Sequence, residues 1–150
     1  MPSLSSSNSL VTSKNRMPDT LIDEHFASGT ASFGGTNADL ANSSETLRVT
    51  TTSAGGYATQ SFTTLASTKY YYSIKLAGSS AGSGDKTIMI GTSGGNASLV
   101  DVTQNTSGVT SSGSFTTGGS TTTIHLGLKV QTDAKYARWD DILIETWDTD

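Results

Sequence analysis

The residue types that most often carry catalysis are few in this chain and poorly placed for it. His25 and His125 are its two histidines, and serine is so abundant that a serine near either one carries no information. Asp140 and Asp141 are adjacent on an expected strand, where successive side chains point to opposite faces. By themselves they are therefore not the facing carboxylate pair that glycoside hydrolysis uses. The sequence predicts a protein that is not an enzyme, with both histidines at the surface or in an interface.

Aromatic side chains offer a second kind of chemistry, stacking on the C–H face of a sugar ring. Such stacking needs a flat ring that is half exposed. Packing in a core or an interface is the competing interpretation for each aromatic residue, and Tyr70 and Tyr72 are expected in the core because they alternate with Ile74. An exposed tryptophan beyond the last expected strand is typical of an anchor for a neighbouring subunit. The candidates for contact with a glycan or an interface are Tyr57, Tyr71, Tyr136, Trp139 and Trp147.

Small residues dominate the composition. The 150 residues include 24 serines, 25 threonines and 16 glycines, and only 33% of the chain is hydrophobic. Serine, threonine and glycine are poor residues for helix interiors. Threonine packs well on a pleated sheet, and glycine serves the turns between strands. The composition therefore predicts an all-β protein of one domain.

Charge and cysteine content exclude several classes of protein. The formal net charge is −4 and no basic patch is visible, so we expect no nucleic-acid partner. With no cysteine, neither a disulfide framework nor a thiolate metal site can form. No run approaches the roughly 20 apolar residues of a membrane span, and the first twenty residues lack the apolar core of a signal peptide. We therefore expect a protein made in a cytoplasm, with no membrane partner.

The chain divides into an arm, a domain and a tail. Residues 1–20 are rich in serine, contain both prolines and show no strand or helix period, so they predict an extended N-terminal arm. Residues 21–147 break into eight or nine short strand-like runs separated by glycine, serine or asparagine turns, which predicts an antiparallel β-sandwich. Residues 148–150 form a short acidic tail. The arm's apolar residues are its expected docking anchors, namely Leu4, Leu10, Val11 and Met17.

Five short pieces follow one another in a distinctive order. They are Asp23-Glu24-His25-Phe26, Leu47-Arg48-Val49, the spaced residues Gln60, Phe62 and Leu65, the segment Lys69-Tyr70-Tyr71-Tyr72-Ser73, and Trp139-Asp140-Asp141-Ile142-Leu143-Ile144. Their order resembles the galactose-binding-like jelly roll of carbohydrate-binding modules, a domain also used in phage virion proteins. The resemblance covers roughly Leu21 to Thr146 and implies an antiparallel jelly-roll fold. Two loops, residues 78–84 and 105–113, lack the aromatic residues that sugar-binding members present there.

The resemblance also implies a structural calcium between the first and last strands. Its ligands would be Asp140 together with Asp23 or Glu24, because calcium binds six to eight oxygen atoms. Alternation along the last strand places Asp140 on the same face as Ile142 and Ile144, so we expect this carboxylate to point inward. The competing interpretation pairs it with Arg138 or Lys135, or with loop amides. In the family, the aromatic position that Trp139 occupies before the two aspartates usually serves packing.

Two functions from different classes follow. The first is a virion structural protein at the virion surface, a capsid decoration (cement) protein or a fibre or spike component of a tailed phage. Its arm would dock to the capsid or to neighbouring subunits, in a homo-oligomer that we expect to be a trimer. The alternative is a carbohydrate-binding module that recognises a surface glycan through exposed aromatic residues.

Overall fold

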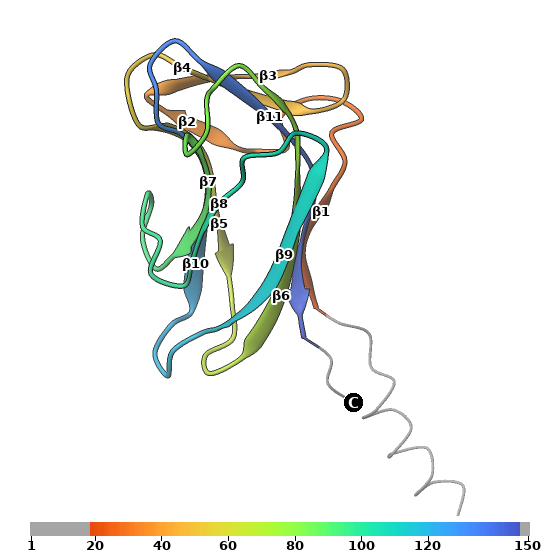
Figure 1. The fold of residues 1–150 in the computed structure, drawn as a ribbon. Helices are drawn as coiled ribbons and strands as arrows, with labels where there is room; N and C mark the ends of the chain where they lie inside the picture. The colour runs from red at the N-terminus through yellow and green to blue at the C-terminus, as the bar shows by residue number, and fades with distance from the viewer. Residues whose placement is uncertain (1–18, 148–150) are drawn as a thin grey trace, which may run out of the picture.

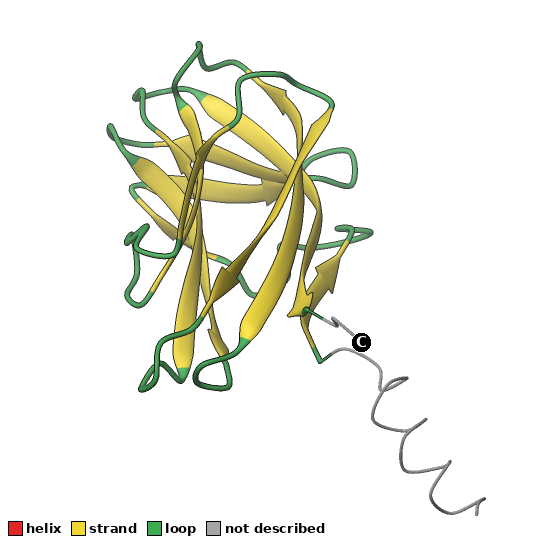
Figure 2. Cartoon of the chain, turned by 60° about the horizontal axis from the view of Figure 1, so that its bottom comes forward, coloured by secondary structure: helices red, strands yellow, loops and turns green. Residues whose placement is uncertain are grey.

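The computed structural model describes residues 19–147, and these form two antiparallel β-sheets packed face to face (Figure 1). Within this range the secondary structure consists of strands, turns and loops, as Figure 2 shows, and no helix is long and apolar enough to cross a membrane. The predicted all-β sandwich is therefore confirmed. The predicted anchors Leu4, Leu10, Val11 and Met17 lie outside the described residues, as does the tail 148–150.

Eleven strands make up the two sheets. Sheet A has the order β3-β4-β11-β6-β9, with β1 also paired to β11, and sheet B has the order β2-β5-β10-β7-β8. In Figure 1, β5, β7, β8 and β10 of sheet B lie on the left, and β1, β6 and β9 of sheet A lie on the right. The strands are β1 (Thr20–Glu24), β2 (Gly34–Thr36), β3 (Ala38–Asn42), β4 (Leu47–Thr51), β5 (Gly56–Thr63), β6 (Lys69–Ser79), β7 (Lys86–Gly91), β8 (Val100–Thr103), β9 (Val109–Thr116), β10 (Thr123–Val130) and β11 (Tyr136–Thr146).

The core lies between the sheets and follows the period-two alternation of the longest strands. On β6 every second residue from Tyr70 to Leu76 is buried, and on β10 the same holds from Ile124 to Val130. Both faces match the expectation from the sequence. Trp139 is fully buried among them, which confirms packing as its role and removes it from the candidates for glycan contact.

The sequence predicted eight or nine strands because two of the eleven carry no clear pattern. Strand β2 is a Gly-Gly-Thr segment exposed throughout, and β3 has a single large apolar residue, Leu40. Both lie at the edges of their sheets, where one neighbouring strand is enough to hold them. Strand β1 begins at Thr20, so pairing with β11 starts within the last residue of the predicted arm.

Strand β11 changes its partner halfway along one edge. Its first part pairs with β4 from Tyr136 to Trp139, and its last part pairs with β1 from Ile142 onward. The register against β6 shifts between Asp140 and Leu143, so a β-bulge occupies the changeover. Asp141 lies in this bulge, and Asp140 is the last paired residue before it.

The bulge overturns the expected orientation of Asp140. Trp139 and Ile142 are both fully buried although they are three residues apart, so simple alternation fails between them. Asp141 has a backbone φ of +49°, in the left-handed region that residues with a side chain seldom adopt. The predicted alternation of Asp140 with Ile142 and Ile144 is therefore wrong, because the strand takes up an extra residue where its partner changes.

Candidate functional site

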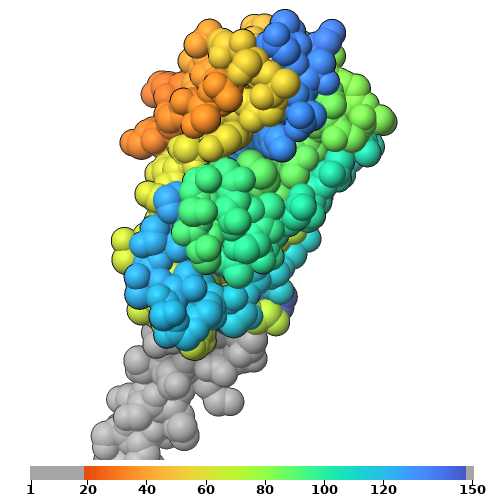
Figure 3. Space-filling view, turned by 90° about the vertical axis from the view of Figure 1, so that its left-hand side faces the viewer, coloured from red at the N-terminus to blue at the C-terminus, as the bar shows by residue number. Residues whose placement is uncertain are grey.

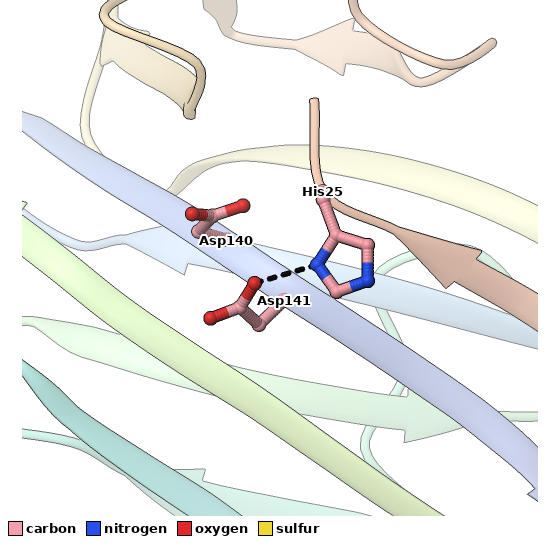
Figure 4. A group of neighbouring side chains, drawn as sticks. All are labelled: His25, Asp140 and Asp141. Atoms are coloured by element: carbon pink, nitrogen blue, oxygen red, sulfur yellow. Dashed lines mark hydrogen bonds and ion pairs between the residues drawn. The ribbon is translucent and has the colours of Figure 1, made fainter. Parts of the chain in front are cut away.

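Three side chains with metal-binding or acid–base chemistry meet at the β11 bulge. His25, just after β1, lies beside Asp140 and Asp141, and one ligand atom from each residue falls within 4.8 Å of the others. Figure 4 shows both carboxylates beside the imidazole. The expectation that the two aspartates point to opposite faces is therefore wrong, and the bulge brings them together.

The imidazole of His25 lies between two carboxylates. Its Nδ1 is 2.7 Å from Oδ1 of Asp141, and its Nε2 is 3.2 Å from Oδ1 of Asp23. The hydrogen bond to Asp141 is the largest cause that raises the pKa of His25 above its ordinary value, and the negative charges of Asp141, Asp23 and Asp140 raise it further. The cluster thus favours a protonated imidazole that links β1 to β11.

The three carboxylates predicted to bind calcium have different surroundings. Asp23 faces His25, and Oε2 of Glu24 accepts a hydrogen bond from the backbone N–H of Phe26 at 2.9 Å. In contrast, Oδ1 of Asp140 is shielded from solvent and has no hydrogen-bond partner in the described structure. A shielded carboxylate oxygen without a partner is costly, so Asp140 fits the role of a cation ligand.

The outer face of sheet B carries a second candidate site, built around Tyr57 on β5. Its neighbours Gly56 and Ala58 are buried, so the half-buried Tyr57 points away from the core. A Cβ placed on Gly127 of β10 would lie 3.9 Å from Cδ2 of Tyr57, and one placed on Gly95 would lie 2.7 Å from its hydroxyl oxygen. The ring therefore extends across β10 toward the β7–β8 loop, over a position that has no side chain.

Met89 packs beside Gly127 at this site, and the sequence analysis did not identify it. It pairs with Gly127, and a Cβ on that glycine would lie 2.7 Å from the Met89 methyl group. Met89 is only 5% exposed, yet it stands apart from the hydrophobic core cluster between the sheets. Its signal in the sequence was its place between Ile88 and Ile90, which alternation assigns to the opposite face.

Polar side chains surround Tyr57 and Met89 on the same face. The cross-strand register places Lys129 opposite Tyr57, Thr59 opposite Gly127, and Asp101 opposite Met89. Figure 3 looks at this face and shows the green β7–β8 segment standing in the middle of it. The surface thus combines an aromatic ring with hydrogen-bonding groups.

The remaining predicted aromatics lie on the outer face of sheet A. Trp147 is 40% exposed, its ring meets that of Tyr71 edge-on at 5.7 Å, and Nζ of Lys69 lies 4.4 Å from its ring centroid. The guanidinium of Arg48 lies 4.3 Å from the ring centroid of Tyr136. These contacts occupy ring surfaces that a sugar would need, which leaves Tyr57 as the best placed of the predicted aromatics.

Two serine motifs also fall in the described range. The pattern Gly-x-Ser-x-Gly, which marks a nucleophile turn between a strand and a helix in one group of hydrolases, occurs at 78–82 and at 91–95. Each copy begins at the end of a strand, β6 or β7, and runs into the loop that leads to the next strand. Neither has the strand–turn–helix context that this chemistry requires.

Comparison with known proteins gives matches among solved structures. Neither a protein-family model nor a curated protein sequence matches the chain. A family 4 carbohydrate-binding module matches with a TM-score of 0.64 at 14% identity, covering 79% of this chain and 97% of the other. The CBM22-1 xylan-binding domain of Paenibacillus barcinonensis Xyn10C matches with a TM-score of 0.58 at 18% identity, over 89% and 97%.

An adhesin domain shares the architecture as well. The K3 cleaved adhesin domain of Lys-gingipain from Porphyromonas gingivalis matches with a TM-score of 0.55 at 11% identity, covering 84% of this chain and 99% of that one. At these identities the likeness concerns the fold. The described chain therefore has the jelly-roll sandwich of carbohydrate-binding modules, as the resemblance in its sequence implied.

Proposed function

We propose that this protein is a carbohydrate-binding module and that its glycan lies on the outer face of sheet B. The observation that carries the proposal is the position of Tyr57, which extends across Gly127 beside Met89. The neighbours of known fold, which include a xylan-binding domain, support the same class of ligand. Of the two functions predicted from the sequence, the findings favour the alternative.

The chemistry of this face suits a sugar ring. The half-buried Tyr57 offers an apolar aromatic surface to sugar C–H groups. Thr59, Lys129 and Asp101 supply the donors and acceptors that sugar hydroxyls require. A few polar groups around an apolar surface are typical of small-ligand sites, where they fix the orientation of the ligand.

Replacing Tyr57 tests the proposal. A glycan array would first identify a neutral oligosaccharide that binds, and calorimetry would then compare wild type with Tyr57→Ala. We expect about a tenfold or greater loss of affinity, equal to about 1.4 kcal/mol, because the stacking surface is removed. Tyr71→Ala is the matched control, since Tyr71 is a half-buried tyrosine on the outer face of the other sheet. Equal affinity in wild type and Tyr57→Ala would contradict the proposed site.

We further propose a structural calcium at the β11 bulge. Asp140 would hold it through its shielded oxygen, with Asp141 beside it at the bulge as a second ligand. Glu24 pairs with the buried Ile142 and accepts a hydrogen bond from Phe26, and the carboxylate of Asp23 faces His25, so both are less suited. The ion would supply positive charge at the point where β11 changes its partner.

The virion role stays a prediction. The compared structures include carbohydrate-binding modules and an adhesin domain, which give the capsid partner and the trimer no support. Its anchors on residues 1–18 lie outside the described residues. A domain that binds a surface glycan can form part of many different proteins, including a virion component.

A further inference from the structure

Two arginines lie directly opposite each other on the outer face of sheet A. Arg48 of β4 and Arg138 of β11 are register partners in the antiparallel pair. The residues on either side of both arginines are fully buried, so the two arginine side chains point away from the core. Cβ atoms of opposed residues in such a pair lie about 4.5–5.5 Å apart, so the two arginine side chains leave the sheet side by side.

Neither arginine is neutralised in the described structure. Among residues 19–147, the ion pairs within 4.0 Å are those that His25 makes with Asp23 and Asp141. Like charges directly opposite on a sheet are destabilising. The chain has more acidic than basic residues, 13 against 9, so an uncompensated cross-strand arginine pair is not a consequence of its composition.

Packing, rather than a counter-ion, holds the two side chains in place. The guanidinium of Arg48 stacks on Tyr136, and its Nε is shielded from solvent without a hydrogen-bond partner in the described range. The guanidinium of Arg138 covers Gly78 of β6, where a Cβ would lie 2.4 Å from Nη2. Gly78 is therefore required for this position of Arg138, and both groups are pre-organised before any ligand arrives.

Neighbouring charges do not cancel the pair. Lys75 of β6 pairs with Asp140 in the next part of the sheet, which sets one cation against one carboxylate. Asp39 of β3 pairs with Thr50, two residues along β4 from Arg48. When Lys75, Asp140 and Asp39 are counted with the two arginines, the net charge of this part of the face is positive.

We propose that Arg48 and Arg138 bind the carboxylate of an acidic glycan, such as a uronic acid residue. Guanidinium groups are planar and donate paired hydrogen bonds that match a carboxylate. The choice of a glycan as the bearer of this carboxylate rests on the proposed function. The arginine pair lies on the opposite face of the sandwich from Tyr57, so it forms a second, separate binding site.

Calorimetry with tetragalacturonic acid and with its methyl ester tests this site. The ester keeps the sugar rings and removes the charge, so we expect it to bind at least tenfold more weakly than the acid. Arg48→Gln and Arg138→Gln should each weaken binding of the acid tenfold or more. Arg138→Lys keeps the charge but loses the paired donors, and it should give an intermediate loss. Lys69→Gln, which removes a cation at the far end of the same face, is the control and should bind as wild type.

Melting temperatures of all variants confirm that they are folded. Acid and ester binding with equal affinity, or acid binding that survives both Arg→Gln changes, would overturn the arginine site. Tyr57→Ala separates this inference from the proposed function: loss of neutral glycan binding in that variant supports the sheet B site whatever the arginine variants do. Acid binding that depends on the arginines, in a protein that binds no neutral glycan, would support the arginine site and reject the site at Tyr57.

Discussion

Asp140 has the most unusual surroundings of the acidic residues discussed above. One of its oxygens is shielded and unpaired, although it belongs to a residue at the surface of sheet A. A carboxylate oxygen that is shielded from water and has no partner lowers stability unless a cation binds it. The proposed calcium removes this cost, and its effect should therefore be measurable as stability.

Calcium removal should lower the melting temperature of the wild-type protein. A ligand that binds only the native state stabilises it, by about 2.7 kcal/mol at one hundred times its dissociation constant. Asp140→Asn should abolish the difference between melts in calcium and in chelator. Asp39→Asn, an exposed aspartate on edge strand β3, should keep it. Equal melting temperatures of the wild-type protein in calcium and in chelator would contradict the proposed calcium site.

At the scale of elements, the alternation of apolar and polar residues predicted the strands that carry it and missed those that do not. Strands β6 and β10 were foreseeable because large apolar residues recur at every second position along them. Strand β2 has no such residue, and β3 has one. The bulge after Asp140 arises where β11 leaves β4 for β1, which is a property of three strands together. No local pattern in one strand contains that information.

The site around Tyr57 was also predictable from the sequence only in part. Tyr57 could be named as a candidate from its residue type alone. Its position over Gly127 and beside Gly95 depends on the pairing of β5 with β10 and on the fold of the β7–β8 loop. Met89 was missed because its two isoleucine neighbours mark the strand as core. Its outward position matters only once a glycine is known to face it on β10.

The β7–β8 loop gives a prediction at this scale. A Cβ on Gly91 would lie 2.3 Å from the backbone oxygen of Asn96, so Gly91→Ala must displace the loop that brings Gly95 to Tyr57. We expect the melting temperature to fall by about 3–10 °C, as for an overpacked site, and neutral glycan binding to change with it. Gly94→Ala is the control in the same loop, because a Cβ there meets nothing within 4 Å. A Gly91→Ala protein as stable as Gly94→Ala would show that the loop does not depend on this contact.

At the scale of the whole molecule, the sandwich has two outer faces with different chemistry. The face of sheet B has the half-buried ring of Tyr57 with polar neighbours, and the face of sheet A has the arginine pair. The core lies between the two proposed sites.

Deleting residues 1–18 separates the roles of the domain and the predicted arm. The described strand pairing begins at Thr20, so we expect the shortened protein to melt at an unchanged temperature. If the arm mediates assembly, as the virion hypothesis predicts, light scattering will show an oligomer in the full chain and a monomer after the deletion. Equal masses would count against an assembly role, and a large fall in melting temperature would show that the arm belongs to the fold.

The pairing of β1 with β11 also determines how the domain responds to a pulling force. The backbone N–H of Thr146 donates to the carbonyl of Asp19 at 2.9 Å, so the two ends of the described chain leave the sandwich side by side (Figure 1). Tension applied through these ends loads the hydrogen bonds of the β1–β11 ladder one after another, because those bonds lie perpendicular to the strands. The hydrogen bonds of the ladder would break in order, from Thr20 toward His25. The ion pair of His25 with Asp141 would then resist the last step, in which the first strand separates from β11.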